Sequence, residues 1–460
     1  MTLQISIQKS NPFDGDKPII QVPLCISEQL NITVDDTIQV KVGRKIVTAE
    51  LIISQDENNI LHMNQRLYQE LFLPLEIIHL QAYYHENRLC LGPVIAVLTE
   101  IRPHKNQPPS FGSIHNYCGE LHHYSQKTGA VVYITSLSKY PNKGFFCMEN
   151  GWAETKMPHP DFIYNRIHSR KNENSKLFKK AITEYKEDNT IFFNSCFVSK
   201  WEVHEQLEKV SQLQAFLPKT SLFDPILFPV WMNQHKDLFL KPVNGSQGHG
   251  IIHVFLENNV IFIERTNSPT PSKHPFKSVS LAAVSIQKWM MKKSYIMQET
   301  IPLITDENKK IDFRFLCHKI NLHEWKITSA VARISGDDQF VSNIAQGGVL
   351  AKPLEILSNH FAREKAVLIY KLMKDLALEV SNIIGQSIDG FFAELGIDIG
   401  VDVKGNPWLI EVNSKPSKQI DSNEKQIRPS TKAIIHYCMN VWKERSHLDD
   451  NNGDINTHST

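Results

Sequence analysis

The residues best suited to chemistry begin with a glycine-rich turn, KPVNGSQGHG, between Lys241 and Gly250. The turn lies between two apolar runs, LFLKPV and GIIHVFLE, so the sequence predicts a strand on each side of it. Glycine tolerates positive φ, which lets backbone N–H groups converge on one point and bind phosphate oxygens. Lys241 adds a positive charge beside them. The segment therefore suggests a flexible flap over a phosphate group.

The same turn also has a plainer interpretation, as an ordinary glycine-rich hairpin. It is not a Walker loop, because no G-K-[ST] ends it, and it is not a dinucleotide fingerprint, because no helix is expected to begin there. If the flap covers a triphosphate, carboxylates that bind magnesium are expected elsewhere in the chain.

Suitable carboxylates lie toward the C-terminal end, in ELGIDIGVD and LIEVNS. Strand alternation places Glu394, Asp398 and Asp402 on one face of the first strand. Glu411 and Asn413 share a face of the second strand, and KGNP between the strands predicts a hairpin turn. This hairpin offers hard oxygen ligands to one or two Mg²⁺ ions. The alternative, a solvated strand edge, fits poorly because apolar neighbours flank each carboxylate.

Further polar groups lie between the turn and the carboxylates. Arg314 in DFRF and Arg333 in TSAVARIS could hold a transferring phosphoryl group or an acyl phosphate, and Asn343 follows in SNIAQGG. A purely structural ion pair between Asp312 and Arg314 stays open as an alternative. The extended segment from Gln298 to Ile301 offers backbone groups to an adenine edge, although apolar strand ends are usually core.

Four regions of the chain must position these groups. Residues 1–90 contain short alternating runs such as TIQVKVG and predict a β-rich module. Residues 91–198 contain a strand, a helix and a strand, which indicates an α/β unit with a partly parallel sheet. Residues 199–445 carry the glycine turn, the arginines and the hairpin, after a helix that Ser199 is expected to cap. Residues 446–460 are polar and are expected to be a disordered tail.

Composition excludes some classes of function. The 460 residues are 41% hydrophobic and 22% charged, with a net charge of +1, so no global field would recruit nucleic acid or an anionic membrane. The basic run NRIHSRKNENSKLFKK is expected to be a solvated helix. We find no signal-peptide pattern and no apolar run long enough to span a bilayer. Seven scattered cysteines indicate reduced thiols, and together these features predict a cytoplasmic protein.

The order of the motifs resembles the ATP-grasp superfamily, above all its RimK- and glutathione-synthetase-like branch. The elements are KP with GSxGxG, QExI, DxR, an arginine, NxxxGG, GID and EVNSxP, over roughly residues 200–440. A closer similarity, to the YheC/YheD endospore coat-associated family, includes PDFIYNRIHSR and ELGIDIGVDVKGNPWLIEVNSKPS and extends over nearly the whole chain. The resemblance implies an α/β protein with an ATP-grasp fold, a preceding α/β domain and a small β-rich N-terminal module.

The resemblance also implies roles for individual residues. Lys241 would contact the α- and β-phosphates. Mg²⁺ would be held by three oxygen-bearing residues, namely Asp398, Glu411 and Asn413. The γ-phosphate and the acceptor would be faced by Arg314, Arg333 and Asn343. Other nucleotide contacts would come from the flap, the adenine hinge and two outlying residues, namely Gly245, Ser246, Gly248, Gly250, Gln298, Glu299, Thr300, Ile301, Lys219 and Asp306.

The acceptor side is the least familiar part of the pattern. Asn165 and Arg166 of the preceding domain would line it. Relatives commonly place glycine after the proline of the last motif, whereas this chain has Ser417 after Pro416, which suggests a different acceptor side.

ATP-grasp enzymes usually convert a carboxylate into an acyl phosphate and let an amine displace the phosphate, a reaction that these residue types suit. The implied function is an ATP- and Mg²⁺-dependent carboxylate–amine (or thiol) ligase, associated with the endospore coat, whose substrate is an amino acid or a peptide. The alternative that stays open is a nucleotide-binding, non-catalytic component that assembles with spore coat proteins. Neither nucleic acid nor a membrane is an expected partner.

Overall fold

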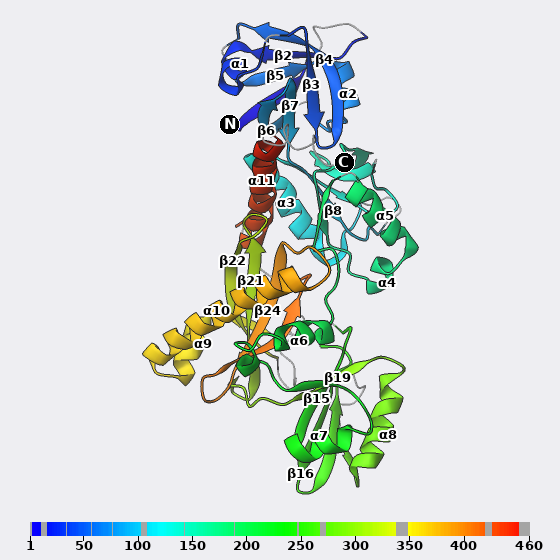
Figure 1. Ribbon diagram of the computed structural model, residues 1–460, viewed down its shortest axis with the longest axis vertical. Coiled ribbons are helices and arrows are strands. Elements are labelled where there is room, and N and C mark those ends of the chain that lie inside the picture. The colour runs from blue at the N-terminus through cyan, green and yellow to red at the C-terminus, as the bar shows by residue number, and fades with distance from the viewer. Residues whose placement is uncertain are drawn as a thin grey trace, which may run out of the picture.

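The computed structural model is elongated and places a barrel and three open sheets one after another along its long axis (Figure 1). It describes residues 2–449 except 11–15, 34, 57, 76, 103–107, 142, 188, 246–247, 267–272, 337–347 and 419–425. Helix α6 (Lys200–Glu208) lies between the last two sheets (Figure 1).

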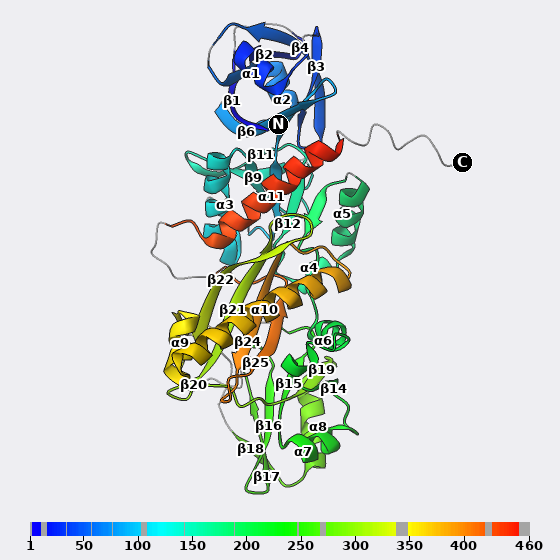
Figure 2. The same ribbon diagram turned by 60° about the vertical axis from the view of Figure 1, so that its left-hand side comes forward.

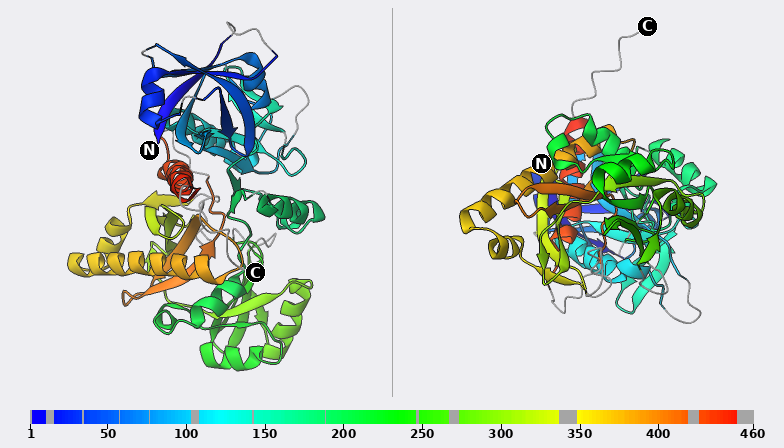
Figure 3. Two further views of the ribbon diagram at one scale, coloured as in Figure 1. Left: turned by 45° about the horizontal axis from the view of Figure 1, so that its top comes forward. Right: turned by 90° about the horizontal axis from the view of Figure 1, so that it is seen from below.

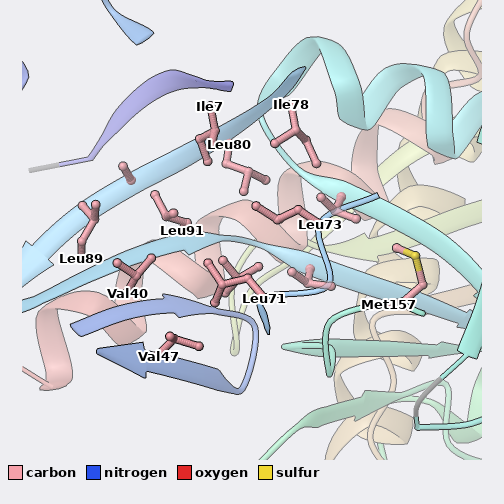
Figure 4. Packing of buried hydrophobic residues seen from close by; sticks show 14 of the residues in the cluster. Ile7, Val40, Val47, Leu71, Leu73, Ile78, Leu80, Leu89, Leu91 and Met157 are labelled. Atoms are coloured by element: carbon pink, nitrogen blue, oxygen red, sulfur yellow. The ribbon is translucent and has the colours of Figure 1, made fainter. Parts of the chain in front are cut away.

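The described residues between 3 and 92 form a closed barrel with the strand order β1-β5-β2-β4-β3-β7-β6. Alternation drives this arrangement: in β3 the side chains of Ile38, Val40 and Val42 are buried while their neighbours are not. Figure 4 shows part of the packed interior, including Val40, Leu80 and Leu91. The elements are β1 (Leu3–Lys9), β2 (Ile19–Pro23), α1 (Leu24–Leu30), β3 (Thr37–Val42), β4 (Lys45–Ser54), β5 (Ile60–Met63), α2 (Gln65–Glu70), β6 (Ile77–His85) and β7 (Arg88–Gly92).

The second body is an α/β sheet with the order β11-β10-β9-β8-β12-β13. Strands β9, β8, β12 and β13 run parallel, which confirms the predicted α/β unit. Every residue of β8, β9 and β12 is buried, as expected for parallel strands covered on both faces. The elements are β8 (Val94–Leu98), η1 (Gly112–Ile114), α3 (His115–Thr128), β9 (Val131–Thr135), β10 (Lys143–Met148), β11 (Gly151–Lys156), β12 (Phe162–Asn165), α4 (Arg170–Glu173), α5 (Lys176–Glu187) and β13 (Ile191–Phe193).

The third body is a sheet with the order β14-β19-β15-β16-β17-β18, packed on α7 and α8. The predicted glycine turn joins β15 to β16, and these strands pair antiparallel. The elements are η2 (Gln214–Phe216), β14 (Thr220–Leu222), α7 (Phe228–His235), β15 (Asp237–Pro242), β16 (Ile252–Glu257), β17 (Val260–Arg265), β18 (His274–Phe276), α8 (Val279–Met290) and β19 (Tyr295–Glu299).

The fourth body is a sheet with the order β23-β22-β21-β24-β25, covered on one face by α9 and α10 (Figure 2). The predicted carboxylate hairpin is present here as β24 and β25. The elements are β20 (Thr305–Asp306), β21 (Lys309–Lys319), β22 (Trp325–Ile334), β23 (Val349–Ala351), α9 (Pro353–His360), α10 (Arg363–Ser387), β24 (Glu394–Val401) and β25 (Pro407–Asn413).

The last helix, α11 (Pro429–Asp449), lies between the barrel and the fourth sheet (Figure 3). Its Tyr437 and Cys438 belong to the core of the α/β body, and Trp442 meets Tyr83 of the barrel at 4.9 Å between ring centroids. The predicted tail therefore needs a correction, because residues 446–449 continue this helix. The helix packs both on α3 of the second body and on β21 and β22 of the fourth sheet.

A buried charge network ties the second body to the fourth. Glu394, at the start of β24, accepts hydrogen bonds from Tyr164, His318 and Lys418 and pairs with Arg166 at 3.3 Å. Burial opposes ionisation, but Lys418, His318 and Arg166 together hold the pKa of Glu394 well below its usual value. Arg166, expected on the acceptor side, is 1% exposed and takes part in this network.

Removing the Glu394 carboxylate should destabilise the protein strongly, because Arg166 and Lys418 would remain buried without their partner. We expect Glu394→Ala to lower the free energy of unfolding by about 3–5 kcal/mol in urea denaturation. The control is Glu184→Ala, which breaks an exposed pair with Lys180 on α5 and should change stability by about 0.5 kcal/mol or less. Equal stability of the two variants would contradict a structural role for the network.

Candidate functional site

A cleft lies where α6, the third sheet and the β24–β25 hairpin meet. The empty space within it, open solvent at its mouth included, is about 480 Å³. One wall is apolar and includes Leu217, Ile296 and Leu409, whereas Lys200, Lys241 and Glu411 form a charged end. The remaining lining residues are Val203, His204, Leu207, Pro218, Thr220, Gln298, Ile410 and Val412. The cleft can therefore accept a molecule with a flat apolar part and an anionic part.

Lys241 lies near the end of β15, and its ammonium donates to Gln298 Oε1 at 2.5 Å. Burial and the neighbouring Lys200 lower the pKa of Lys241, Glu411 opposes the decrease, and the net value is about 8. Lys241 remains protonated at neutral pH and offers its charge to the cleft.

The glycine turn is anchored beside the carboxylate hairpin. Lys200 Nζ donates to the carbonyl of Gly245 at 2.9 Å and to Glu411 Oε1 at 2.7 Å, so one ammonium joins the two elements. Gly248 and Gly250 adopt positive φ of 72° and 74°, which side chains rarely tolerate. Ser246 lies outside the described residues.

The hairpin has the register that alternation predicts. Asp398 lies directly opposite Glu411, and Asn413 lies opposite Gly396 with its amide 3.3 Å from Asp398 Oδ2. Asp402 has a different role, because it accepts bonds from the backbone of Lys404 and Asn406 and fixes the turn. The three expected ligands Asp398, Glu411 and Asn413 are thus brought together.

Both arginines pair with carboxylates of neighbouring strands. Arg314 forms a two-pronged pair with Asp398, directly opposite on β24. Arg333 pairs with Asp312 at 2.5 and 2.6 Å and also reaches Asp398 Oδ2 at 2.9 Å. The register places each arginine opposite a carboxylate of a neighbouring strand, so both arginines take part in structural ion pairs. Burial disfavours the charge on Asp398, yet Arg314 and Arg333 hold the pKa of Asp398 below its usual value.

The charge balance at this end of the site favours an anion. Four cationic side chains, Lys200, Lys241, Arg314 and Arg333, accompany three carboxylates, those of Asp312, Asp398 and Glu411. No three His, Cys, Asp or Glu side chains form a metal-binding group within the described residues. Two carboxylates and an amide still fit Mg²⁺, provided that phosphate oxygens supply the remaining ligands and charge.

The hinge is present, but part of its backbone is already engaged. The N–H of Glu299 donates to Lys219 O at 3.1 Å, and the N–H of Thr300 donates to Asp237 O at 3.2 Å. Glu299 Oε1 in turn accepts from the N–H of Lys219.

Among the described residues that were predicted for the site, Lys241, Gln298 and Glu411 line the cleft. The side chain of Lys219 is exposed, and its neighbours Pro218 and Thr220 line the cleft instead. Asp306 is exposed on β20, where it pairs with Lys309. Asn343 lies outside the described residues. Asn165, predicted on the acceptor side, donates to Glu173 and to the carbonyl of Ser195.

Lys200 lines the cleft but was not predicted from the sequence. It directly follows Ser199, whose hydroxyl accepts the N–H of Glu202 and caps α6 as predicted. A lysine in the first helical turn opposes the helix dipole, so its presence there is a signal of another role. The sequence alone does not identify that role, because it depends on the contact of α6 with β25, where Lys200 meets Glu411.

Comparison with known proteins agrees with this architecture. The model of the YheC/D like ATP-grasp family matches residues 189–441, more than half of the chain. The chain therefore belongs to the YheC/D-like ATP-grasp family.

Two curated relatives come from Bacillus subtilis (strain 168). The endospore coat-associated protein YheD is 26% identical over 424 residues, covering 90% of each chain. The endospore coat-associated protein YheC is 24% identical over 298 residues, covering 62% of this chain and 78% of YheC. A solved structure, the VanG D-Ala:D-Ser ligase from Enterococcus faecalis, has a TM-score of 0.43 at 12% identity, covering 77% of this chain and 99% of VanG. Among the described helices, none is both long and apolar enough to cross a membrane.

The anchoring role of Lys200 can be tested without a ligand. Lys200→Ala removes the bonds to Gly245 and Glu411, so backbone amides in the peptide 241–250 should exchange with deuterium about tenfold faster. Hydrogen exchange followed by mass spectrometry measures this rate. Lys209→Ala, which removes only an exposed contact with Gln206, is the control and should leave the rate unchanged. Unchanged exchange in both variants would show that Lys200 does not hold the turn.

Proposed function

We propose that this chain is an ATP- and Mg²⁺-dependent ligase that joins a carboxylate to an amine or a thiol. The observation that carries the proposal is the cleft itself, in which Lys200 connects the glycine turn to Glu411 of the hairpin. The apolar wall suits a purine ring, and the excess of cations suits a triphosphate. Membership of the ATP-grasp family supports the same reading.

In the proposed reaction, Lys200 and Lys241 bind phosphate oxygens, and the glycine turn covers the phosphates and excludes water. A substrate carboxylate oxygen attacks the γ-phosphorus, the bond to the β-phosphate oxygen breaks, and ADP leaves. The amine or thiol then attacks the acyl carbon, loses its proton, and expels inorganic phosphate. Arg314 and Arg333 would stabilise negative charge on the transferring group from the side of β21 and β22.

Magnesium, held by Asp398, Glu411 and Asn413, would neutralise charge on the phosphates during transfer. The surplus of cations in the cleft makes binding of free Mg²⁺ unfavourable without a nucleotide. We therefore propose that metal and nucleotide enter together.

A second candidate is a nucleotide-binding component without ligase turnover. Both arginines already form two-pronged pairs with carboxylates, which leaves them fewer free N–H groups for a phosphoryl group. The names of YheC and YheD support association with the endospore coat, with coat proteins as partners under either candidate. Under the first candidate the substrate would be an amino acid or a peptide.

Nucleotide binding can be tested by thermal and chemical denaturation. Mg²⁺ with ATP at about a hundredfold excess over a micromolar Kd should stabilise the protein by about 2.7 kcal/mol, whereas Mg²⁺ alone should not. Lys241→Ala and Glu411→Gln should each lose most of this stabilisation. Asp375→Asn, an exposed site on α10, is the matched control and should behave as the wild type. Absence of any Mg·ATP effect in the wild type would contradict the nucleotide site.

Turnover separates the two candidates. A panel of amino acids and short peptides, offered in pairs as carboxylate and amine donors, should raise ADP release at least tenfold above the rate without substrates. Asp398→Asn should return this rate to background, because it weakens the proposed metal site and the ion pairs with Arg314 and Arg333. Binding of Mg·ATP without ADP release for any pair would favour the non-catalytic component.

A further inference from the structure

We infer that Thr220 and Gln298 form a one-directional hydrogen-bond relay that positions the Lys241 ammonium toward the phosphate end of the cleft. The inference rests on the proposed nucleotide site and adds positioning residues to it. Sequence reasoning assigned Gln298 only to an adenine hinge and assigned nothing to Thr220. The relay instead connects this strand end to the phosphate lysine.

The direction of the relay follows from donor and acceptor chemistry. The carbonyl of Pro218 can only accept, and Thr220 Oγ1 donates its single hydrogen to it at 2.9 Å. The Thr220 oxygen must then accept from Gln298 Nε2, which lies 3.0 Å away. That orientation turns Gln298 Oε1 toward Lys241 Nζ at 2.5 Å. A flipped amide would set its N–H₂ group against the ammonium and its carbonyl against the hydroxyl oxygen.

The sheet register makes the relay rigid. Thr220 on β14 lies directly opposite Gln298 on β19, and Gln298 lies opposite Phe239 on β15. Lys241 is two residues farther along β15, on the same face as Phe239, so its stem reaches the amide diagonally. Pro218, Thr220, Gln298 and Lys241 all line the cleft. The relay therefore runs along one wall, from the chain before β14 to the charged end.

A neutral amide is a suitable partner for this lysine. The flexible stem of lysine loses much rotamer freedom when it is fixed, so a preformed bond lowers the entropic cost of binding phosphate. A carboxylate in the same place would compete with the phosphate for the ammonium, whereas an amide only orients it. Glu411, the nearest carboxylate, is hydrogen-bonded to Lys200.

The same arrangement makes phosphate binding sensitive to pH. The charged and titratable groups that face Lys241 are Lys200 and His204 of α6 and Glu411 of β25. Burial lowers the pKa of Lys241 to about 8, so the ammonium is lost as pH rises through that value. Affinity for phosphates should therefore be highest below about pH 7 and should fall as the pH rises through about 8.

Calorimetric titration with Mg·ADP between pH 6.5 and 9.5 tests the relay without requiring turnover. At pH 7.5, Thr220→Val should weaken binding about tenfold, because the amide loses the acceptor that orients it. Thr220→Ser keeps the hydroxyl and should stay within about twofold of the wild type. Gln298→Glu should weaken binding at pH 7.5 and move the fall in affinity upward by about one pH unit, because a carboxylate stabilises the ammonium.

Controls separate the relay from general damage and from the proposed function. Ser221→Ala, on the same strand, should leave both affinity and pH profile unchanged, and thermal unfolding shows whether each variant is folded. Wild-type protein that binds Mg·ADP, with Thr220→Val at equal affinity or Gln298→Glu at an unshifted pH profile, would overturn the relay alone. Wild-type protein that binds no Mg·ADP at any pH would overturn the nucleotide site as well.

Discussion

The site depends on one electrostatic constraint, an excess of buried or half-buried positive charge at one end of a cleft. Lys200 and Lys241 line this end with a single carboxylate, Glu411. Arg314 and Arg333 lie outside the cleft lining and pair with Asp398 and Asp312. Unpaired charge in such a place is costly, and a polyanionic ligand relieves the cost. The charge that we propose a triphosphate to neutralise is therefore present before any ligand is bound.

Sheet register is what brings these charges together. Asp398 faces Arg314 on one side and Glu411 on the other, and Arg333 faces Asp312 one strand farther out. Because the side-chain period of a strand is two, a shift of one residue would send the whole set to the face covered by α10. The Glu394 network and α11 then fix this sheet to the preceding bodies.

Much of this arrangement could be predicted from the sequence, for local reasons. Alternation was enough to place Asp398, Glu411 and Asn413 on one hairpin, and glycine content was enough to locate the turn after Lys241. The partners of Arg314 and Arg333 could not be predicted, because they depend on which strands become neighbours. Lys200 and Thr220 were missed for the same reason, because the residues that each of them contacts are distant in the sequence. The burial of Arg166 could not be predicted either, because it depends on three segments that are separate in the sequence.

The central claim is that a nucleotide's phosphates complete the charge of this cleft. The most direct measurement is an experimental structure of the protein with Mg²⁺ and a non-hydrolysable ATP analogue. The account predicts phosphate oxygens within hydrogen-bond distance of Lys200 and Lys241, metal between the phosphates and Asp398, Glu411 and Asn413, and the base against Leu217, Ile296 and Leu409. An analogue bound elsewhere, or phosphates remote from both lysines, would contradict it.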